Sequence, residues 1–390
     1  MQDNEKKPAL RFKGFTDPWE QRKLAEIANF SKGVGYSKND LCEEGTPIIL
    51  YGRLYTKYET SIFDVDTFVK EKAGSVYSKG GEVIVPASGE TAEDISIASV
   101  VVKPGILLGG DLNVVSPTTE YDSAFLALTI SSGAAHEYLS SLAQGKSVVH
   151  LHNTDIQSVS AKFPTKREQE KIHLLFGKID TLITLHQRKY EKLVNIKKSM
   201  LDKMFPQNGV SVPEIRFKGF TDPWEQRKLG DLCVEFRSGE FISASDITET
   251  GEYPVFGGNG LRGFTDRFNH DGEYTLIGRQ GALCGNVNFA VGKSYFTEHA
   301  IAVRADKKNQ TRFLYYLFST LDLGQYSGQS AQPGLAVGNL VELKSTLPDK
   351  QEQEKISGVL TALDTLITLH QRKLEKLQNI KKSCLEKMFV

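Results

Sequence analysis

The stretch RFKGFTDPWEQRKL occupies Arg11–Leu24, and the same fourteen residues recur at Arg216–Leu229. A second stretch, DTLITLHQRK, occupies Asp180–Lys189 and recurs at Asp364–Lys373. In both copies EQEKI precedes this second stretch, and NIKKS and KMF follow it. The chain therefore runs twice through a repeated box, a variable region and a helix-forming segment. An internal repeat of this kind predicts one structural plan built twice.

The regions between the repeats differ as much as the repeats agree. Residues 25–163, the first module, and residues 230–347, the second module, differ in length and show little direct identity. Near-identical frames beside dissimilar inserts favour a fixed scaffold that carries two exchangeable modules. A plain duplication whose middle part diverged faster is the alternative, and the sequence leaves it open.

The expected architecture is an α+β fold with a pseudo-twofold internal repeat. Two long antiparallel coiled-coil helices are expected to hold two globular domains apart. A chain of 390 residues has room for two to four domains. The expected boundaries are 1–163 for the first domain (with the box at 11–24), 164–205 for a central helical spacer, 206–347 for the second domain (with the box at 216–229) and 348–390 for a second helical spacer.

The helix-forming segments are residues 166–204 and 350–388. Pro164 and Pro348 stand just before them, where a helix begins, and apolar residues recur every seven positions. At about 1.5 Å per residue, each helix would be roughly 58 Å long. Histidines at one seam position suggest register-setting polar residues, because further metal ligands at helical spacing are missing. The expected seam consists of Ile172, Ile179, His186, Leu193, Ile356, Leu363, His370 and Leu377.

Each module shows short apolar runs separated by glycine-rich turns, followed by a helical pattern. This indicates an α+β module with recognition loops on a rigid scaffold. The lysine pairs in the helices, Lys197-Lys198 and Lys381-Lys382, suggest solvated faces, with phosphate contact as the alternative. The expected strands are 46–51, 82–85 and 96–102 in the first module and 253–256, 274–277 and 300–303 in the second, and the expected helices are 123–143 and 311–321.

Charge and composition limit the possible functions. The net charge is zero, and residues 25–163 carry 10 basic and 17 acidic groups, so a DNA-binding face must be a local patch. No run of about 18 apolar residues predicts a membrane span, and the N-terminus lacks a signal-peptide pattern. The four cysteines are far apart, which disfavours a zinc site or a disulfide framework. A cytoplasmic protein is expected.

No catalytic site is expected in this chain. Two Gly-Lys-Ser triplets, at 145–147 and 292–294, lack the earlier glycine of a phosphate-binding loop. The 13 prolines are never adjacent, so the Asn/Asp-Pro-Pro-aromatic segment of an amino-methyltransferase is absent. Neither a Ser/His/Asp nor a Cys/His set stands out. We therefore expect neither catalytic nor metal-binding residues.

Over essentially its full length, the chain resembles the specificity subunit of Type I restriction–modification enzymes. The resemblance rests on the box FKGFTDPWEQRKL before each module and on P-x-x-x-EQEKI at the start of each helix. It also rests on YPVFGGNGLRGF at 253–264 and LIGRQG at 276–281, with looser variants YGRLY at 51–55 and VPASG at 85–89. Any one of these signals is weak, and together they are strong.

The resemblance implies two target-recognition domains, each recognising one half of a bipartite double-stranded DNA site. It implies that two methyltransferase (M) subunits dock on the helices and that restriction (R) subunits join the full complex. S-adenosylmethionine, ATP and Mg are then expected on those partners, with no cofactor bound by this chain and no membrane partner. A structural coiled-coil scaffold whose modules bind protein rather than DNA is the alternative function.

The expected DNA contacts are polar and basic side chains in glycine-rich loops, which suit base edges and phosphates. For each of them, turn chemistry or an internal hydrogen bond is the alternative role. Gly257, Gly258 and Gly260 are expected to shape one loop. The candidates are Tyr51, Arg53, Ser88, Lys146, Ser147, His150 and His152 in the first module and Asn259, Arg262, Arg279, Gln280, Gln329, Ser330 and Gln332 in the second.

Overall fold

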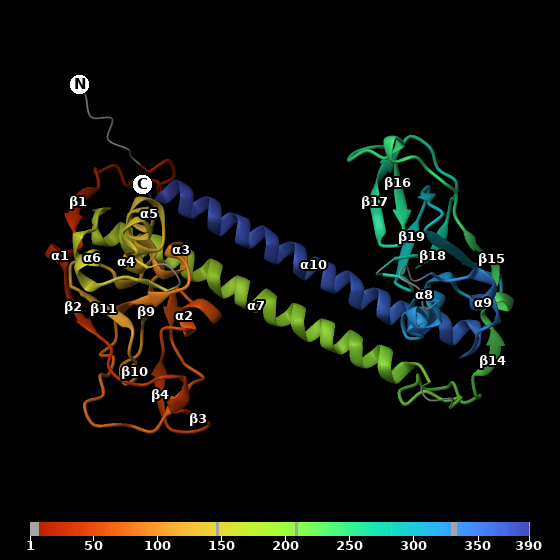
Figure 1. Cartoon of the computed structure of the whole chain (residues 1–390), viewed down its shortest axis with the longest axis horizontal. Coiled ribbons are helices and arrows are strands. Elements are labelled where there is room, and N and C mark those ends of the chain that lie inside the picture. Colours follow the sequence, from red (N-terminus) through yellow and green to blue (C-terminus); the bar gives the residue numbers. More distant parts are fainter. Residues whose placement is uncertain (1–7, 146–147, 207–209, 282, 329–333, 390) are drawn as a thin grey trace. The chain divides into compact units, whose positions relative to one another are not determined.

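The computed structural model of this chain describes residues 8–145, 148–206, 210–281, 283–328 and 334–389. The chain divides into two compact units. Unit 1 comprises Met1–Arg188 with Gln371–Val390, and unit 2 comprises Lys189–His370. Each unit therefore contains one module and one part of each long helix (Figure 1).

The first module is an α+β structure built on two sheets. The larger sheet has the strand order β2-β11-β7-β9-β5, and the smaller one has the order β10-β4-β6-β3. The elements up to the first long helix are β1 (Glu20–Lys23), α1 (Leu24–Ile27), β2 (Ala28–Lys32), η1 (Lys38–Asp40), β3 (Leu41–Cys42), β4 (Thr46–Ile49), α2 (Arg53–Thr56), β5 (Ser61–Ile62), β6 (Phe68–Val69), β7 (Glu82–Pro86), β8 (Ser88–Gly89), α3 (Ala92–Ile95), β9 (Ser99–Val101), β10 (Leu107–Leu108), β11 (Leu112–Pro117), α4 (Ser123–Ile130), α5 (Gly133–Leu142), β12 (Val149–His150), α6 (Asn153–Ser158), β13 (Ser160–Phe163) and α7 (Lys166–Met204).

The second module repeats the central strand order with different surroundings. Its larger sheet has the strand order β15-β21-β18-β19, in which β15, β21 and β18 correspond to β2, β11 and β7 of the first module. Its smaller sheet has the order β17-β16-β20. The elements are β14 (Glu225–Lys228), η2 (Leu229–Leu232), β15 (Cys233–Ser238), η3 (Ala244–Asp246), β16 (Tyr253–Gly257), β17 (Gly260–Thr265), β18 (Glu273–Gly278), β19 (Val287–Val291), β20 (Tyr295–Phe296), β21 (Ala300–Ala305), α8 (Thr311–Ser319), η4 (Leu323–Tyr326), α9 (Val337–Glu342), β22 (Lys344–Leu347) and α10 (Lys350–Met388).

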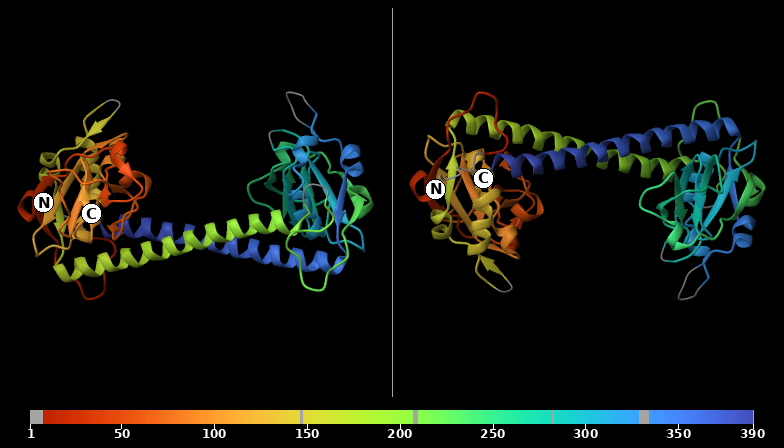
Figure 2. Two further views of the ribbon diagram at one scale, coloured as in Figure 1. Left: turned by 90° about the horizontal axis from the view of Figure 1, so that it is seen from below. Right: turned by 90° about the horizontal axis from the view of Figure 1, so that it is seen from above.

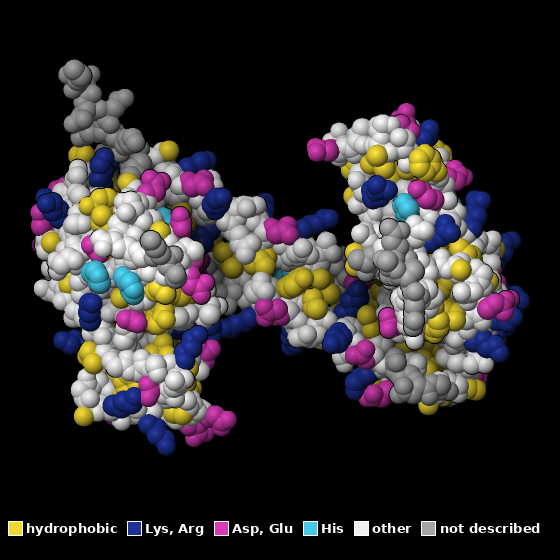
Figure 3. Space-filling model, in the orientation of Figure 1, with side chains coloured by type: hydrophobic (Ala, Val, Ile, Leu, Met, Phe, Trp, Pro, Cys, Tyr) yellow, Lys and Arg dark blue, Asp and Glu magenta, His cyan; other side chains and the backbone are white. Residues whose placement is uncertain are grey.

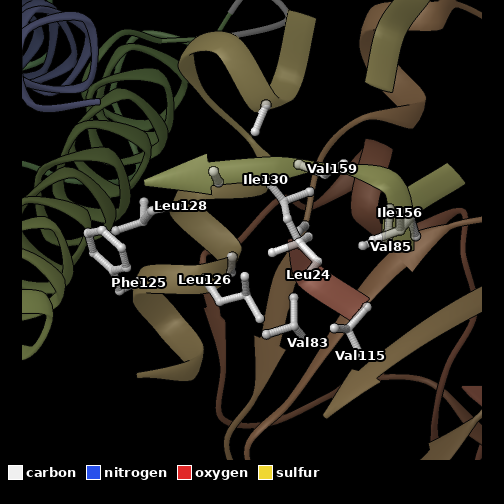
Figure 4. Close-up of a cluster of buried hydrophobic side chains, with 14 of the residues drawn as sticks. Leu24, Val83, Val85, Val115, Phe125, Leu126, Leu128, Ile130, Ile156 and Val159 are labelled. Carbon is white, nitrogen blue, oxygen red and sulfur yellow. The ribbon is translucent and has the colours of Figure 1, made fainter. Parts of the chain in front are cut away.

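The core of the first module lies between the larger sheet and the helices that cover it. Leu24, the last residue of the repeated box, is fully buried beside Val83 of β7 and Val115 of β11 (Figure 4). Helix α4 packs against β7 and β9, and seven of its eight residues are buried. A helix that is apolar on all sides belongs inside a core. The repeated box is thus part of the core.

The repeated box ends in a strand that pairs with the strand leading into the long helix. In unit 1, β1 pairs antiparallel with β13, with Glu20 opposite Phe163. In unit 2, β14 pairs antiparallel with β22, with Glu225 opposite Leu347. The same two-stranded ribbon therefore brings the box to the start of each helix.

A buried ion pair fastens each box to its helix. The guanidinium of Arg11 donates to both carboxylate oxygens of Glu168 at 2.9 and 2.7 Å, and that of Arg216 donates to both oxygens of Glu352 at 2.8 Å. Both glutamate side chains are 1% exposed. Hydrogen bonding to these carboxylates raises the pKa of both arginines. The fork geometry of this pair admits few substitutes for the arginine of each box.

The end of each long helix packs against the other module. The backbone N–H of Leu10 donates to the carbonyl of Lys387 at 3.0 Å, and that of Ile215 donates to the carbonyl of Lys203 at 2.9 Å. Phe389 stacks on Phe125 in the first module, with ring centroids 5.4 Å apart. The corresponding pair in the second module is Phe205 and Phe313, at 5.5 Å.

This packing fixes the direction of the helices within each unit. The start of α7 and the end of α10 belong to unit 1, and the end of α7 and the start of α10 belong to unit 2. Lys381 of α10 pairs with Asp180 of α7 at 2.6 Å in unit 1, and Lys197 of α7 pairs with Asp364 of α10 at 2.5 Å in unit 2. The expected antiparallel arrangement and the helix bounds 166–204 and 350–388 are confirmed within the units.

Four sequence-based expectations differ from the structure. The predicted helix 123–143 is two helices, because the hydroxyls of Ser131 and Ser132 bond back to α4 and Gly133 has φ +60°. The predicted strand 46–51 ends at Ile49, and the predicted strand 96–102 begins at Ser99. Lys197 and Lys381 are not solvated, because each is bound to an aspartate with its side chain 22% or 19% exposed.

We predict that Glu168→Gln lowers the free energy of unfolding of unit 1 by about 3 kcal/mol, because it leaves the part-buried Arg11 without a charged partner. Hydrogen exchange in urea, resolved by unit, measures this. The matched control is Glu170→Gln in the same helical turn, where the side chain is exposed, and about 0.5 kcal/mol or less is expected. Equal effects of both variants would contradict the role assigned to the ion pair.

Candidate nucleic-acid interface

A close backbone crossing occurs at the same place in both modules. In the first, Gly33 N–H donates to the carbonyl of Leu112 at 3.0 Å, and a Cβ on Gly33 would lie 1.9 Å from the carbonyl oxygen of Gly109. In the second, Gly239 N–H donates to the carbonyl of Ala300 at 2.9 Å, and a Cβ there would lie 2.2 Å from the oxygen of Phe296. Only glycine fits so close to another backbone.

Further backbone bonds make the neighbouring loops of the two modules equivalent. Ala87 N–H donates to the carbonyl of Asp111 at 2.8 Å, as Arg279 N–H donates to the carbonyl of His299 at 2.9 Å. The carbonyls of Ala87 and Arg279 then accept from Leu151 at 3.1 Å and from Leu335 at 2.8 Å. One end of each module therefore gathers the same loops: 33–37, 50–53, 87–90, 109–111 and the residues on either side of 146–147 in the first, and 239–243, 257–262, 279–281, 297–299 and the residues on either side of 329–333 in the second.

Three candidates of the first module lie together at this end. The hydroxyl of Ser88 and Nδ1 of His150 are 3.1 Å apart across the β8–β12 pair. Ser88 is buried, whereas His150 and His152 are exposed. Within unit 1, β12 lies on the side of the module away from the long helices in both views of Figure 2. The two histidines can therefore meet a ligand that the helices do not obstruct.

Arg53 has a different environment from the one expected. Its side chain is 7% exposed, and its guanidinium is bound to Glu59 at 2.9 Å and to Asp66. Hydrogen bonds from Lys57, which has the larger effect, and from Arg53 lower the pKa of Asp66 to about 2. Arg53 could contact a phosphate only by giving up these partners.

A pocket of about 950 Å³ lies beside Arg53 in the first module. Tyr51 is half-buried at its wall, with its ring 6.2 Å from that of Tyr55 in an edge-to-face arrangement. Burial raises the pKa of Tyr55, whose hydroxyl donates to the carbonyl of Ser88 at 2.6 Å. Tyr51 thus connects the wall of the pocket, through Tyr55, to the loop that carries Ser88.

The candidates of the second module also converge. Asn259 and Arg262 are exposed on the β16–β17 hairpin, and Gln280 is exposed on the loop after β18. The hairpin and that loop touch, because a Cβ on Gly258 would lie 3.6 Å from the carbonyl oxygen of Gln280. Gln280 also forms an isolated bridge with Gly334. Among the described residues, Arg262 and Arg279 have no acidic partner within ion-pair distance.

The glycines of the hairpin lie in close surroundings. Gly260 has φ +94°, a conformation that favours glycine. A Cβ on Gly257 would lie 2.6 Å from Cδ of Arg262, and one on Gly258 would lie 3.0 Å from the oxygen of His299. These contacts are consistent with the expected role of the three glycines in shaping the loop.

Sequence reasoning missed four residues at this end of the second module. Nδ2 of Asn288 and Oε2 of Glu298 are buried, with no hydrogen-bond partner among the described residues. His299 lies next to Glu298, with Nε2 3.3 Å from Oε1. Phe241 is 74% exposed, although it is aromatic. None of these residues stands in a motif, and only the aromatic side chain of Phe241 in a glycine-flanked loop could have drawn attention.

The remaining site predictions concern undescribed residues and the helix seam. Lys146, Ser147, Gln329, Ser330 and Gln332 lie outside the described residues. Of the seam residues, Ile172 and Ile356 are buried in the cores of the first and second modules. Ile179 is also buried, and His186, Leu193, Leu363, His370 and Leu377 are half-buried.

The described residues lack the features of two other kinds of site. They contain no group of three or more His, Cys, Asp or Glu residues that could hold a metal ion. They also contain no helix that is long and apolar enough to cross a membrane.

Comparison with known proteins gives a consistent result. Residues 16–195 and 221–379 match the family model described as the Type I restriction modification DNA specificity domain. The specificity subunit of the Type I restriction enzyme EcoprrI of Escherichia coli is 42% identical over 164 residues, which cover 41% of this chain and 40% of that protein. That of MjaVIII of Methanocaldococcus jannaschii is 21% identical over 347 residues, covering 81% and 80%.

Solved structures share the fold. The S subunit of a Type-I restriction–modification system from M. genitalium superimposes with a TM-score of 0.75 at 17% identity, covering 98% of this chain and 99% of that one. A chain from work on complex assembly and conformational transition of the type I R-M system has a TM-score of 0.50 at 16% identity, covering 96% and 98%. Because the sequence identities are this low, these superpositions show only that the fold is shared.

We predict that Gly33→Ala and Gly239→Ala each lower the free energy of unfolding by about 1–3 kcal/mol, because the added methyl group meets backbone that cannot move aside. Urea denaturation measures this. Gly177→Ala and Gly358→Ala serve as controls. Both glycines lie within long helices with nothing within 4 Å of an added Cβ, so these changes should stabilise by about 0.5–1 kcal/mol. If all four variants behaved alike, the close crossings would not be needed for the loop arrangement.

Proposed function

The chain belongs to the family of Type I restriction modification DNA specificity domains, and from this we propose that it is the subunit that selects the DNA sequence for such a system. Each module recognises one half of a bipartite double-stranded site. The bases between the halves are not contacted. The chain itself binds no cofactor and catalyses no reaction.

The observation that carries this proposal is the repeated loop cluster. The same backbone crossings place five loops at one end of each module, while the side chains on those loops differ. Base edges are distinguished by hydrogen-bonding side chains presented in the major groove. Two equivalent loop sets with different side chains therefore suit two half-sites of different sequence.

In the second module the loop cluster offers a set of groups that suits base recognition. The guanidinium groups of Arg262 and Arg279 suit guanine, the amide of Gln280 suits adenine, and the carboxylate of Glu298 suits the amino group of cytosine. The unpartnered Oε2 of Glu298 is consistent with an acceptor that is satisfied only in the complex.

In the first module the corresponding groups are Ser88, His150, His152 and Tyr51. Arg53 takes a supporting role in this proposal, because its ion pairs with Glu59 and Asp66 hold the loop that carries Tyr51. Lys146 and Ser147, which lie outside the described residues, precede His150 in the sequence and remain candidates for phosphate contacts.

The long helices dock two methyltransferase subunits. Apolar side chains that are about 40–55% exposed lie on both helices: Leu174, Leu182, Leu185 and Ile380 in unit 1, and Leu366 and Leu369 in unit 2. Figure 3 shows hydrophobic side chains on the surface of the helices. Leu182 and Leu185 occupy the same repeat positions as Leu366 and Leu369. A repeated apolar surface suits two copies of one partner.

The methyltransferase and restriction subunits also supply the basic surface that attracts DNA and the groups that carry out the reactions. Lys and Arg side chains alternate with Asp and Glu on the face shown in Figure 3, and the first module has more acidic than basic groups. Basic partner surfaces that enclose the DNA would supply the missing attraction to phosphate. Those subunits bind S-adenosylmethionine and methylate adenine, and restriction subunits add ATP- and Mg-dependent steps in the cytoplasm.

The first test is methylome sequencing of a host that expresses this chain with a matched methyltransferase subunit. The expected result is a new methyladenine motif in two short halves separated by unspecified bases. If the complex assembles and such a motif does not appear, the alternative of a coiled-coil scaffold whose modules bind protein is favoured.

Once the motif is known, Arg279→Ala should weaken binding about 10- to 100-fold through one base pair of a single half-site. The measurement is binding of the assembled complex to duplexes substituted at each position. Lys308→Ala is the control, because Lys308 is exposed beyond the opposite end of β21. Equal losses at both half-sites, or equal losses in the two variants, would count against base recognition by Arg279.

A further inference from the structure

We propose that Asp180 and Asp364 are positioning residues that set the orientation of each module on the long helices and thereby the spacer length that the protein accepts. This inference rests on the proposed function. It concerns a pair of aspartates in the repeated stretch DTLITLHQRK, at the same position of both copies.

In unit 1, Asp180 connects three elements. Its Oδ1 pairs with Nζ of Lys381 on α10 at 2.6 Å, and its Oδ2 accepts a hydrogen bond from the hydroxyl of Thr60 at 3.0 Å. Nζ of Lys381 also lies 5.7 Å from the ring centre of Tyr58. Thr60 is buried, and its carbonyl accepts from Val100 N–H in β9 at 2.9 Å. The aspartate thus links both helices to the sheet of the first module.

In unit 2, Asp364 makes the equivalent contacts with a different module. Its Oδ1 pairs with Nζ of Lys197 on α7 at 2.5 Å, and its Oδ2 accepts from the hydroxyl of Tyr316 at 2.8 Å. Nζ of Lys197 lies 5.8 Å from the ring centre of Tyr316. Tyr316 is fully buried in α8, which packs against β18.

The two units share the charged pair and differ in the group that the module offers. Lysine and aspartate are identical in the repeats, whereas the hydroxyl comes from threonine in one module and from tyrosine in the other. A constant frame can therefore accept an unrelated module that presents one hydroxyl at this place. The four charged side chains are 19–33% exposed, so water screens them only in part.

The aspartates attach each module to its helix at a second place along the helix axis. Glu168 and Glu352 hold the module at the start of each helix, and Asp180 and Asp364 follow twelve residues later. At about 1.5 Å per residue, the two attachment points are roughly 18 Å apart along the helix. Together with the ribbon and the stacked phenylalanines, an attachment this far along the helix resists tilting of the module on the helix. A fixed tilt fixes where the recognition loops meet the duplex.

The test uses the full chain assembled with its methyltransferase subunits. Methylation rates are measured on duplexes that carry both half-sites, with the spacer one base pair shorter than, equal to, or one base pair longer than the natural one. We expect Asp180→Asn and Asp364→Asn each to reduce the preference for the natural spacer about five- to tenfold. The half-site sequences should not change. Asp202→Asn on α7 is the control, because its side chain is exposed.

The exchange Asp180→Lys with Lys381→Asp should restore the preference to within about twofold of the natural chain, because it keeps the pair and the hydroxyl of Thr60 can accept as well as donate. An unchanged preference in both single variants overturns the inference, and so does an equal loss of rate on all three spacers. Both results leave the natural chain with its bipartite motif. Absence of that motif from the natural complex would instead refute the proposed function, and this inference with it.

Discussion

The buried ion pair between each repeated box and its helix is the constraint on which the rest of the structure depends. Glu168 and Glu352 are almost inaccessible to water, and each carboxylate is neutralised by two parallel hydrogen bonds from one arginine. A buried pair of this kind contributes more to a unique geometry than to net stability, because desolvation offsets much of the attraction. It sets where each helix leaves its module. The ribbon, the aromatic contacts and the aspartate links then fix one orientation.

The positions at which the two copies within this chain agree, and those at which they differ, follow from that arrangement. Residues that fasten module to helix recur in both copies, as the boxes and the helix stretches show. Residues on the loops at the other end are free to differ, because the scaffold holds those loops through backbone bonds and glycine crossings rather than through particular side chains. A structure organised in this way can change what it recognises without changing how it is assembled.

The sequence predicted the helices well and the loop environments poorly. Prolines and a seven-residue apolar spacing are local signals, and they fixed both helix bounds. The partners of Arg53 and Lys197 are not local: Glu59 and Asp66 surround the arginine only after the loop folds, and Asp364 is far away in sequence. Lys197-Lys198 therefore resembled a solvated face. The loop ends of both modules were predicted from glycine-rich segments, but buried groups such as Asn288 carry no sequence signal.

The packing of each helix end against the other module has a consequence for folding during synthesis. Unit 2 is continuous in the chain, from Lys189 to His370, whereas unit 1 needs the segment that begins at Gln371. Met388 and Phe389 are part of the core of the first module. That core stays incomplete until the ribosome has released these residues, even though the module is made first. The second module can therefore close earlier than the first, and until then the first exposes an apolar site around Phe125 that chaperones can bind.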